Sequence, residues 1–466
     1  MQLNYPIQNV KLSLTLSLLF AFITFKGTAQ YADTLSRPLP VNNFWNSPLV
    51  KKTTIPATLL IATAVTWPHK QEIREVRNRF IPKFRYHFDD YLQYAPGVAV
   101  ATLNAFNVKG KHSPKRAFAS SAFSMMIMGT LVNTIKHTAS VERPDGSSKN
   151  TFPSGHTAMA FTNATILDKE YGQYRHQLYG VGGYAMATAT ALGRGLNNRH
   201  WVPDVLTGAA IGILSTELGY MIADKIFGDK GINAPLRNNP IPISNKPSFI
   251  ELHLGYANAL SKDLTTVGTD EFKAKQGFNF GLEGAWFMSK YVGIGGELAF
   301  TSFPVNSDRI KLDDELLDLS TGIHTQALGV KYLNIGPYFS YPLPNNWFIT
   351  AKVNTGISSG SSGNIILELN EKTQKELGRS ELRYLRYKPK TAESWSAGMG
   401  IQKRIGRNTA IKAYTTYFSS KHEFAMQGLD DIKDNGELVY TPIQSDNSKV
   451  NFNHLTFGLG LTAFLW

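Results

Sequence analysis

Residues 278–300 read FNFGLEGAWFMSKYVGIGGELAF, and this stretch indicates the fold of the second half of the chain. Apolar and aromatic side chains alternate with small or polar ones on both sides of the short turn Ser289-Lys290. Because successive side chains of a strand point to opposite faces, this period of two predicts two antiparallel strands that share one apolar face.

The same alternation recurs along the chain after Ser248 and defines eight apolar series. Each series is long enough for a strand, and an even number of antiparallel strands can close into a barrel without open edges. The eight series lie at residues 250–256, 278–288, 292–300, 333–341, 347–353, 395–401, 411–417 and 455–461.

The connections between these series alternate strictly between long and short. Short connections lie at Ser289-Lys290, Pro342–Asn346 and Gly406–Asn408, and long ones at 260–277, 302–328, 358–393 and 420–453. Outer-membrane barrels have short turns at one end, long loops at the other and aromatic residues near the strand ends. A soluble β-sandwich, the alternative, gives no reason for this alternation. Residues 248–466 resemble the small eight-stranded outer-membrane barrels, and we expect an antiparallel transmembrane β-barrel that serves as an anchor.

Charged residues occur at positions that would face the barrel interior. A barrel of eight strands has room inside for little more than its own side chains. We therefore expect these charges to form structural ion pairs rather than a transport path. The residues concerned are Glu251, His253, Glu283, Glu297, Lys352 and Lys412.

The first half of the chain has a helical pattern, so the fold class is multidomain, with an all-α bundle before the barrel. The longest uncharged stretch, 117–135, is borderline for a membrane span. Residues 30–228 are predicted to form the helical domain, and 229–247, rich in Pro, Asn and Gly, a linker. Candidate helices lie near residues 54–66, 95–107, 116–137, 157–169, 178–193 and 204–226.

The N-terminus has the pattern of a secretory signal peptide over residues 1–29. Lys11 precedes an uncharged run at 12–25, and small residues precede the expected cleavage site after Ala29. The alternative, a membrane anchor, needs about 20 apolar residues, more than this run offers. We therefore expect an exported protein.

Composition narrows the classes of function. The chain has no cysteine, which excludes disulfides, a thiolate metal site and a lipidated N-terminal cysteine. The formal net charge of +13 favours anionic partners. A mean hydropathy of −0.19 argues against a protein made only of membrane-spanning helices.

Three motifs in the helical half carry the candidate chemistry. They are KHTASVERP at 136–144, PSGH at 153–156, and Arg194 followed by His200 and Asp204. In this order they resemble the three signature motifs of the type 2 phosphatidic acid phosphatase superfamily, which also contains acid phosphatases and vanadium haloperoxidases. The third motif of the family usually opens with Ser-Arg, whereas this chain has Gly193 before Arg194. The missing hydroxyl is expected to weaken one hydrogen bond and to leave the charged groups intact.

The residue types suit phosphoryl transfer, which requires neutralisation of the phosphate oxygens. Lys136, Arg143 and Arg194 supply three cations, so we expect neither a metal ion nor another cofactor. Ser154 and Gly155 open a predicted helix, whose free N–H groups would face a bound phosphate.

The resemblance also implies the catalytic roles. His200 would attack phosphorus and form a phosphohistidine, and Asp204 would hold its ring. The spacing of four residues brings these two side chains together if the segment is helical. His156 would protonate the leaving group and then activate water.

Relatives of this family include six-helix inner-membrane proteins and soluble periplasmic enzymes. Because a barrel and an inner-membrane bundle cannot easily share one chain, we expect a periplasmic bundle tethered to the outer membrane. The expected partner is a phosphorylated lipid or, alternatively, a small soluble phosphate ester, and no nucleic acid is expected. A vanadate haloperoxidase and a non-catalytic lipid-binding barrel are further alternatives, and the oligomeric state stays open.

Overall fold

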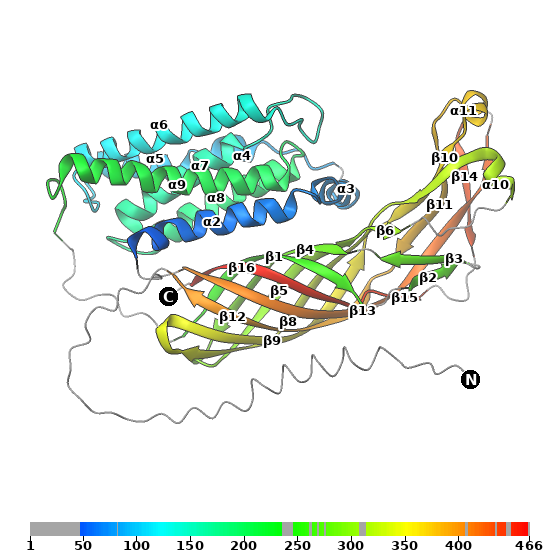
Figure 1. Cartoon of the computed structure of the whole chain (residues 1–466). Coiled ribbons are helices and arrows are strands. Elements are labelled where there is room, and N and C mark those ends of the chain that lie inside the picture. Colours follow the sequence, from blue (N-terminus) through cyan, green and yellow to red (C-terminus); the bar gives the residue numbers. More distant parts are fainter. Residues whose placement is uncertain are drawn as a thin grey trace, which may run out of the picture. The chain divides into compact units, whose positions relative to one another are not determined.

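The computed structural model describes the chain between Ser47 and Phe464, and its parts are shown in Figure 1. The predicted signal peptide lies outside the described residues, as do the turn at 406–408 and most of the predicted linker. Within the described range, the structure leaves out residues 82, 235–245, 261–262, 268–269, 275, 307–313, 406–408, 434–435 and 444–448.

The first half is helical, as the sequence predicts, and each of the six expected helices is present. α3 and α4 were not predicted. A π-helical turn at Asp168–Gly172 extends α7. The helices are α2 (Pro48–Thr66), α3 (Lys70–Phe80), α4 (Phe88–Leu92), α5 (Ala95–Ala105), α6 (Pro114–Ala139), α7 (Gly155–Leu167), α8 (Leu178–Leu196) and α9 (Val202–Phe227).

α9 forms the centre of the bundle and lies against α2, α6 and α7. Its glycines allow an unusually close approach to α7. A Cβ atom at Gly208 would lie 2.5 Å from the carbonyl oxygen of Ser154, and one at Gly212 would lie 2.5 Å from that of Ala158. The backbones of the two helices therefore touch, and this contact positions the N-termini of both.

Two of the helices, α6 and α9, are long and apolar enough to cross a membrane by length and composition. In the most apolar window of α9, 67% of the residues are buried within the protein, against 22% for α6. α9 thus has the burial expected of a core helix, whereas α6 exposes apolar side chains such as Phe118 and Met126.

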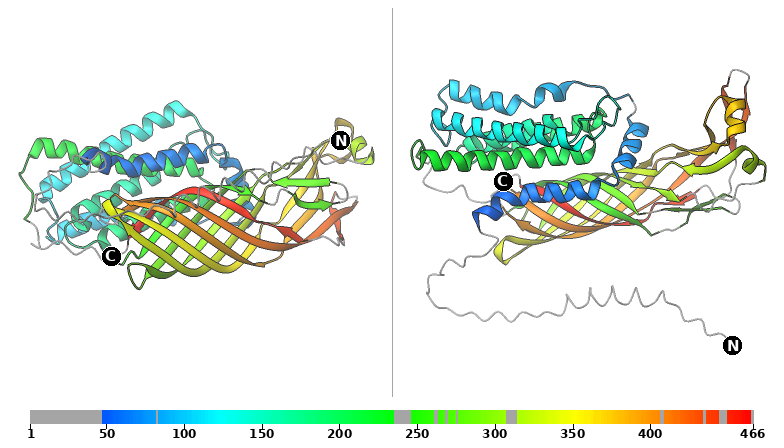
Figure 2. Two further views of the ribbon diagram at one scale, coloured as in Figure 1. Left: turned by 60° about the horizontal axis from the view of Figure 1, so that its bottom comes forward. Right: turned by 45° about the horizontal axis from the view of Figure 1, so that its top comes forward.

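Eight strands of the second half form a closed antiparallel ring, which confirms the predicted barrel. Each strand pairs with its neighbours in the ring, and the pairing of β12 with β13 closes it. The left view of Figure 2 shows the strands tilted around a common axis. The strands are β1 (Phe249–Ala259), β4 (Gly277–Phe287), β5 (Val292–Phe303), β8 (Leu328–Leu343), β9 (Trp347–Gly360), β12 (Ala392–Arg404), β13 (Thr409–Ile432) and β16 (His454–Phe464).

The alternation of residues 278–300 separates an outer face of the barrel from an inner one, as the sequence predicts. Leu282 of β4 pairs with Leu298 of β5, and both side chains are exposed on the outer face. Glu283 pairs with Glu297 in the next row, and both are buried inside. An apolar outer face with a polar interior is the pattern of a barrel surrounded by lipid.

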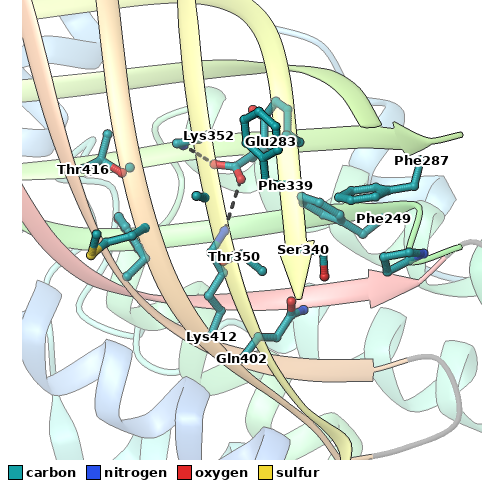
Figure 3. Close-up of a pocket in the computed structure, with 16 residues that line it drawn as sticks. Phe249, Glu283, Phe287, Phe339, Ser340, Thr350, Lys352, Gln402, Lys412 and Thr416 are labelled. Atoms are coloured by element: carbon teal, nitrogen blue, oxygen red, sulfur yellow. Dashed lines mark hydrogen bonds and ion pairs between the residues drawn. The ribbon is translucent and has the colours of Figure 1, made fainter. Parts of the chain in front are cut away.

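Ion pairs fill the barrel interior, as expected. The ammonium of Lys412 lies 3.0 Å from Glu251 and 3.1 Å from Glu283. Lys352 also binds Glu283, and Figure 3 shows both lysines reaching this carboxylate beside a pocket lined by barrel residues. Lys352 further pairs with Glu297 at 3.0 Å, and His253 Nε2 is 3.6 Å from the same carboxylate.

The long connections contain regular structure that the sequence analysis did not predict. β13 continues past the ring to Ile432 and carries a further sheet, whose apolar side chains Leu367, Leu369 and Leu382 are buried. The additional elements are β2 (Asp263–Val267), β3 (Asp270–Ala274), β6 (Val305–Asn306), α10 (Asp314–Leu319), β7 (Ser320–Thr325), β10 (Gly363–Leu369), α11 (Glu371–Leu377), β11 (Glu381–Pro389), β14 (Leu438–Ile443) and β15 (Lys449–Asn451).

Replacement of Glu283 by Gln is expected to destabilise the barrel, because it removes the carboxylate that both lysines share. Loss of one partner from a buried ion pair costs about 3–5 kcal/mol. Urea unfolding followed by heat-modifiable gel mobility measures this loss, with replacement of the exposed Lys421 by Gln as the control. Equal stability of the two variants would contradict the structural role of the pairs.

Candidate active site

The three motifs meet around the N-termini of α7 and α9. The backbone N–H of Ser154, at the start of α7, donates to the carbonyl of Asp204 over 3.0 Å. The N–H of His200 donates to the carbonyl of Arg194 over 3.3 Å. The second motif is thus bonded to the third, and the first residue of the third motif is bonded to its histidine.

His200 lies beside Asp204, but the local structure differs from the expected one. α9 begins at Val202, so His200 precedes the helix and Asp204 lies in its first turn. The Asp204 carboxylate accepts a hydrogen bond from the N–H of Trp201 at 2.9 Å and lies 3.4 Å from His200 Nδ1. A helix-capping contact, rather than a helical spacing, therefore brings the pair together.

Thr151 is the third member of this group, and the sequence analysis did not select it. Its hydroxyl donates to Asp204 Oδ2 over 2.5 Å and lies 3.1 Å from His200 Nδ1. Its own N–H donates to the carbonyl of Val141 over 3.1 Å. All three side chains of the group are buried. With Nδ1 held in this way, Nε2 is the nitrogen available for attack.

The surroundings keep His200 uncharged. Burial lowers the pKa of His200 to about 4, and the positive charges of Arg194 and Lys136 add to the effect. The Asp204 carboxylate raises this pKa but does not outweigh burial. A neutral imidazole is the form that can act as a nucleophile.

His156 lies in the first turn of α7 and is partly exposed. Its Nε2 is 3.2 Å from Oδ1 of Asp90, a residue of α4. Burial lowers the pKa of His156, Arg194 lowers it further, and Asp90 and Asp89 oppose both effects. This imidazole can exchange a proton with a ligand at the surface of the site.

Arg194 is buried at the end of α8, and α4 holds one side of its guanidinium. Nη1 donates to Asp89 Oδ2 over 3.1 Å and to Asp90 Oδ1 over 2.9 Å. Within the described part of the chain, the buried Nε has no hydrogen-bond partner. The Nε–H therefore keeps hydrogen-bonding capacity that the described residues do not use.

Lys136 and Arg143 supply the other two cations. Lys136 is in the last turn of α6 and donates to the carbonyl of Asn150. Burial and the positive charge of Arg194 lower the pKa of Arg143. The Nε of Arg143 is also buried without a partner among the described residues.

Ser154 is the N-cap of α7, as predicted, and its hydroxyl accepts from the N–H of Thr157 over 3.4 Å. Gly155 is the first residue of the helix. A Cβ atom there would make only ordinary contacts, 3.7 Å from Val132 and 3.9 Å from Lys136. Packing of the protein alone does not require this glycine, so the explanation that a ligand approaches its backbone stays a prediction.

Gly193 has a structural reason that the sequence analysis did not find. A Cβ atom at this position would lie 2.8 Å from Cβ of Asp89 and 2.9 Å from the ring of Phe88. The serine that the family usually has here would collide with α4. The glycine thus makes room for α4, and the expected loss of one hydrogen bond stays a prediction.

The arrangement of these groups agrees with the family comparison. Residues 117–227 match the model of the PAP2 superfamily. This part of the chain is a PAP2 domain. The matched segment contains every site residue that the sequence analysis selected, whereas Asp89 and Asp90 precede it.

The chain is also similar to a lipid A 1-phosphatase of Porphyromonas gingivalis. The two proteins are 42% identical over 172 residues, which is 37% of this chain and 38% of the relative. The chain therefore aligns with well under half the length of this relative.

Two solved structures are similar to parts of this chain. Aquifex aeolicus LpxE shares 22% identity and covers 32% of this chain and 93% of its own, with a TM-score of 0.26. The outer membrane protein OprG of Pseudomonas aeruginosa shares 9% identity. The match covers 47% of this chain and 96% of OprG, with a TM-score of 0.29.

Replacement of Thr151 by Val is expected to lower kcat for phosphate release by about ten- to a hundredfold, the effect of losing a hydrogen bond to a charged group. Replacement by Ser keeps the hydroxyl and should restore most of the rate. Steady-state kinetics of both variants test this. Equal rates for the two variants would show that the hydroxyl has no part in holding His200.

Proposed function

We propose that this protein is a metal-independent acid phosphatase of phosphorylated lipid headgroups, held in the outer membrane by its barrel. The observation that carries the proposal is the buried group of His200, Asp204 and Thr151, which holds Nδ1 of a neutral imidazole and leaves Nε2 as the nucleophilic nitrogen. The substrate would be a phosphomonoester or a pyrophosphate.

In the first step, Nε2 of His200 attacks phosphorus while the bond to the leaving oxygen breaks. Lys136, Arg143 and Arg194 neutralise the charge on the other phosphate oxygens. The imidazole becomes positively charged as it is phosphorylated, and the nearby Asp204 carboxylate stabilises that charge. His156 donates its proton to the leaving alcohol or phosphate.

In the second step, water replaces the imidazole. His156, now neutral, takes a proton from the water as its oxygen attacks phosphorus. The bond between phosphorus and Nε2 breaks, and inorganic phosphate leaves. Both residues return to their starting protonation states, so the cycle is balanced without another reactant.

The helical half of the chain supports the proposed substrate, and the barrel supports the proposed location. Similarity to a lipid A 1-phosphatase favours a lipid phosphate, and the barrel favours the outer membrane. We propose a signal peptide at 1–29, a periplasmic catalytic domain at 30–228, a linker at 229–247 and the barrel at 248–466. A periplasmic phosphatase of small soluble esters is the second candidate, because His156 is accessible from the surface of the site.

Replacement of His200 by Ala is expected to abolish release of inorganic phosphate, because it removes the imidazole that is proposed to form the phosphohistidine. The loss should exceed about a thousandfold, while heat-modifiable mobility of the barrel stays unchanged. Replacement of His176, an exposed histidine between α7 and α8, by Ala serves as the matched control.

The assay compares lipid A, phosphatidylglycerol phosphate, undecaprenyl pyrophosphate and a chromogenic monoester. Turnover retained without His200 would refute the mechanism. Lipid binding without hydrolysis by the unmodified protein would favour the non-catalytic alternative. Vanadate should inhibit a phosphatase, and halide oxidation with added vanadate would instead indicate a haloperoxidase.

The pH dependence of kcat/KM should be bell-shaped and lie on the acid side of neutrality. Activity should fall below about pH 4, where His200 becomes protonated. It should also fall as the pH rises through the lowered pKa of His156, which must start protonated.

The stability of the fold also depends on pH in the acid range. Because the unfolded chain binds a proton at His200 more readily than the folded chain does, stability should decrease as the pH falls from about 6.5 to 4. Rate and unfolding measurements across this range test both statements, and full activity at alkaline pH would contradict the role of His156.

A further inference from the structure

The short helix α4 contributes two carboxylates to the candidate site, although it lies outside the three motifs. Asp89 and Asp90 are consecutive residues, and both contact Nη1 of Arg194. Asp89 is almost fully buried and also accepts from Nδ2 of Asn197 over 2.9 Å. α4 is therefore fixed against the end of α8 by several polar contacts.

Asp90 contacts both His156, the proposed acid for the leaving group, and Arg194, a proposed ligand of the phosphate. Its Oδ1 lies 2.9 Å from Nη1 of Arg194 and 3.2 Å from Nε2 of His156. The other oxygen, Oδ2, lies 3.4 Å from Nδ1 of the exposed His87. A carboxylate in this place receives the Nε2–H of His156 and leaves Nδ1 as the nitrogen that can exchange a proton with substrate.

The charges around His156 show why such a partner is needed. Burial and the guanidinium of Arg194 both favour the neutral imidazole, and Asp90 and Asp89 favour the protonated one. A general acid must carry its proton when the substrate arrives. Without these carboxylates, the nearby positive charge would favour the neutral imidazole still more, and His156 would lose its proton at a lower pH.

Gly193 is the feature that permits this arrangement. Its missing side chain lets Asp89 and Phe88 approach α8 to distances that a Cβ atom would prevent. The glycine directly precedes Arg194, so the same backbone segment supplies the cation and the space for its partners. Two independent observations, the ion pairs and the close approach, thus point to α4 as part of the site.

We propose that Asp90 is a positioning residue for the reaction: it orients His156 and keeps it protonated, while Asp89 holds Arg194 in place. This inference rests on the proposed phosphatase function. It adds that Asp90, by keeping His156 protonated, sets the pH above which activity falls.

The test compares Asp90→Asn with the unmodified full chain in detergent, using a chromogenic phosphomonoester. The amide keeps the shape and removes the charge. We expect the alkaline limb of kcat/KM to move down by about one pH unit, as for loss of a neighbouring opposite charge, with a larger fall in kcat than rise in KM. Asp229→Asn, an exposed residue after α9, is the matched control. An unchanged alkaline limb in Asp90→Asn would overturn the proposal.

A second measurement does not depend on turnover. NMR titration of the imidazole nitrogens, with the His156 signal assigned by its absence in His156→Gln, gives the pKa of His156 directly. It should fall in Asp90→Asn, and also in Gly193→Ser, which forces α4 away. An unaltered pKa in Asp90→Asn would refute the inference. If the unmodified protein releases no phosphate but this pKa still falls, the pairing stands and only the phosphatase function fails.

Discussion

The carboxylate and backbone of Asp204 connect most parts of the catalytic domain. Its side chain accepts from the N–H of Trp201 and from Thr151, and it faces His200. Its carbonyl accepts from Ser154 at the start of α7. One buried residue therefore starts a helix, orients the candidate nucleophile and joins two motifs that are about fifty positions apart in the chain. A change at Asp204 would disturb structure and chemistry together.

Much of this molecule could be predicted because its signals are local. The alternation in residues 278–300 directly reports which face of a strand lies on the apolar outside of the barrel, and the six predicted helices have apolar stretches of their own. The charged residues of the motifs were recognisable by type and order. α4 gave no such signal, because its five residues are too few for a helical period and its aspartates look like ordinary surface charges. Their role arises from the fold, which places them on Arg194 and His156.

Thr151 and the structural reason for Gly193 were missed on different grounds. Each residue lies beside a motif and is chemically plain, so its meaning depends on a partner that is distant in sequence. The regular structure in the long connections was hidden in a similar way. The strands there are short, and their apolar residues become meaningful only when β13 extends beyond the ring to pair with them.

The contact between α7 and α9 has a consequence for how this domain can change. Gly208 and Gly212 bring backbone against backbone, so side chains do not set the distance between the two helices. His156 follows the start of one helix and His200 precedes the other. The spacing between the proposed proton donor and the proposed nucleophile is thus fixed by main-chain geometry. Side chains elsewhere on α7 and α9 can therefore be exchanged without altering that spacing, as long as Gly208 and Gly212 are kept.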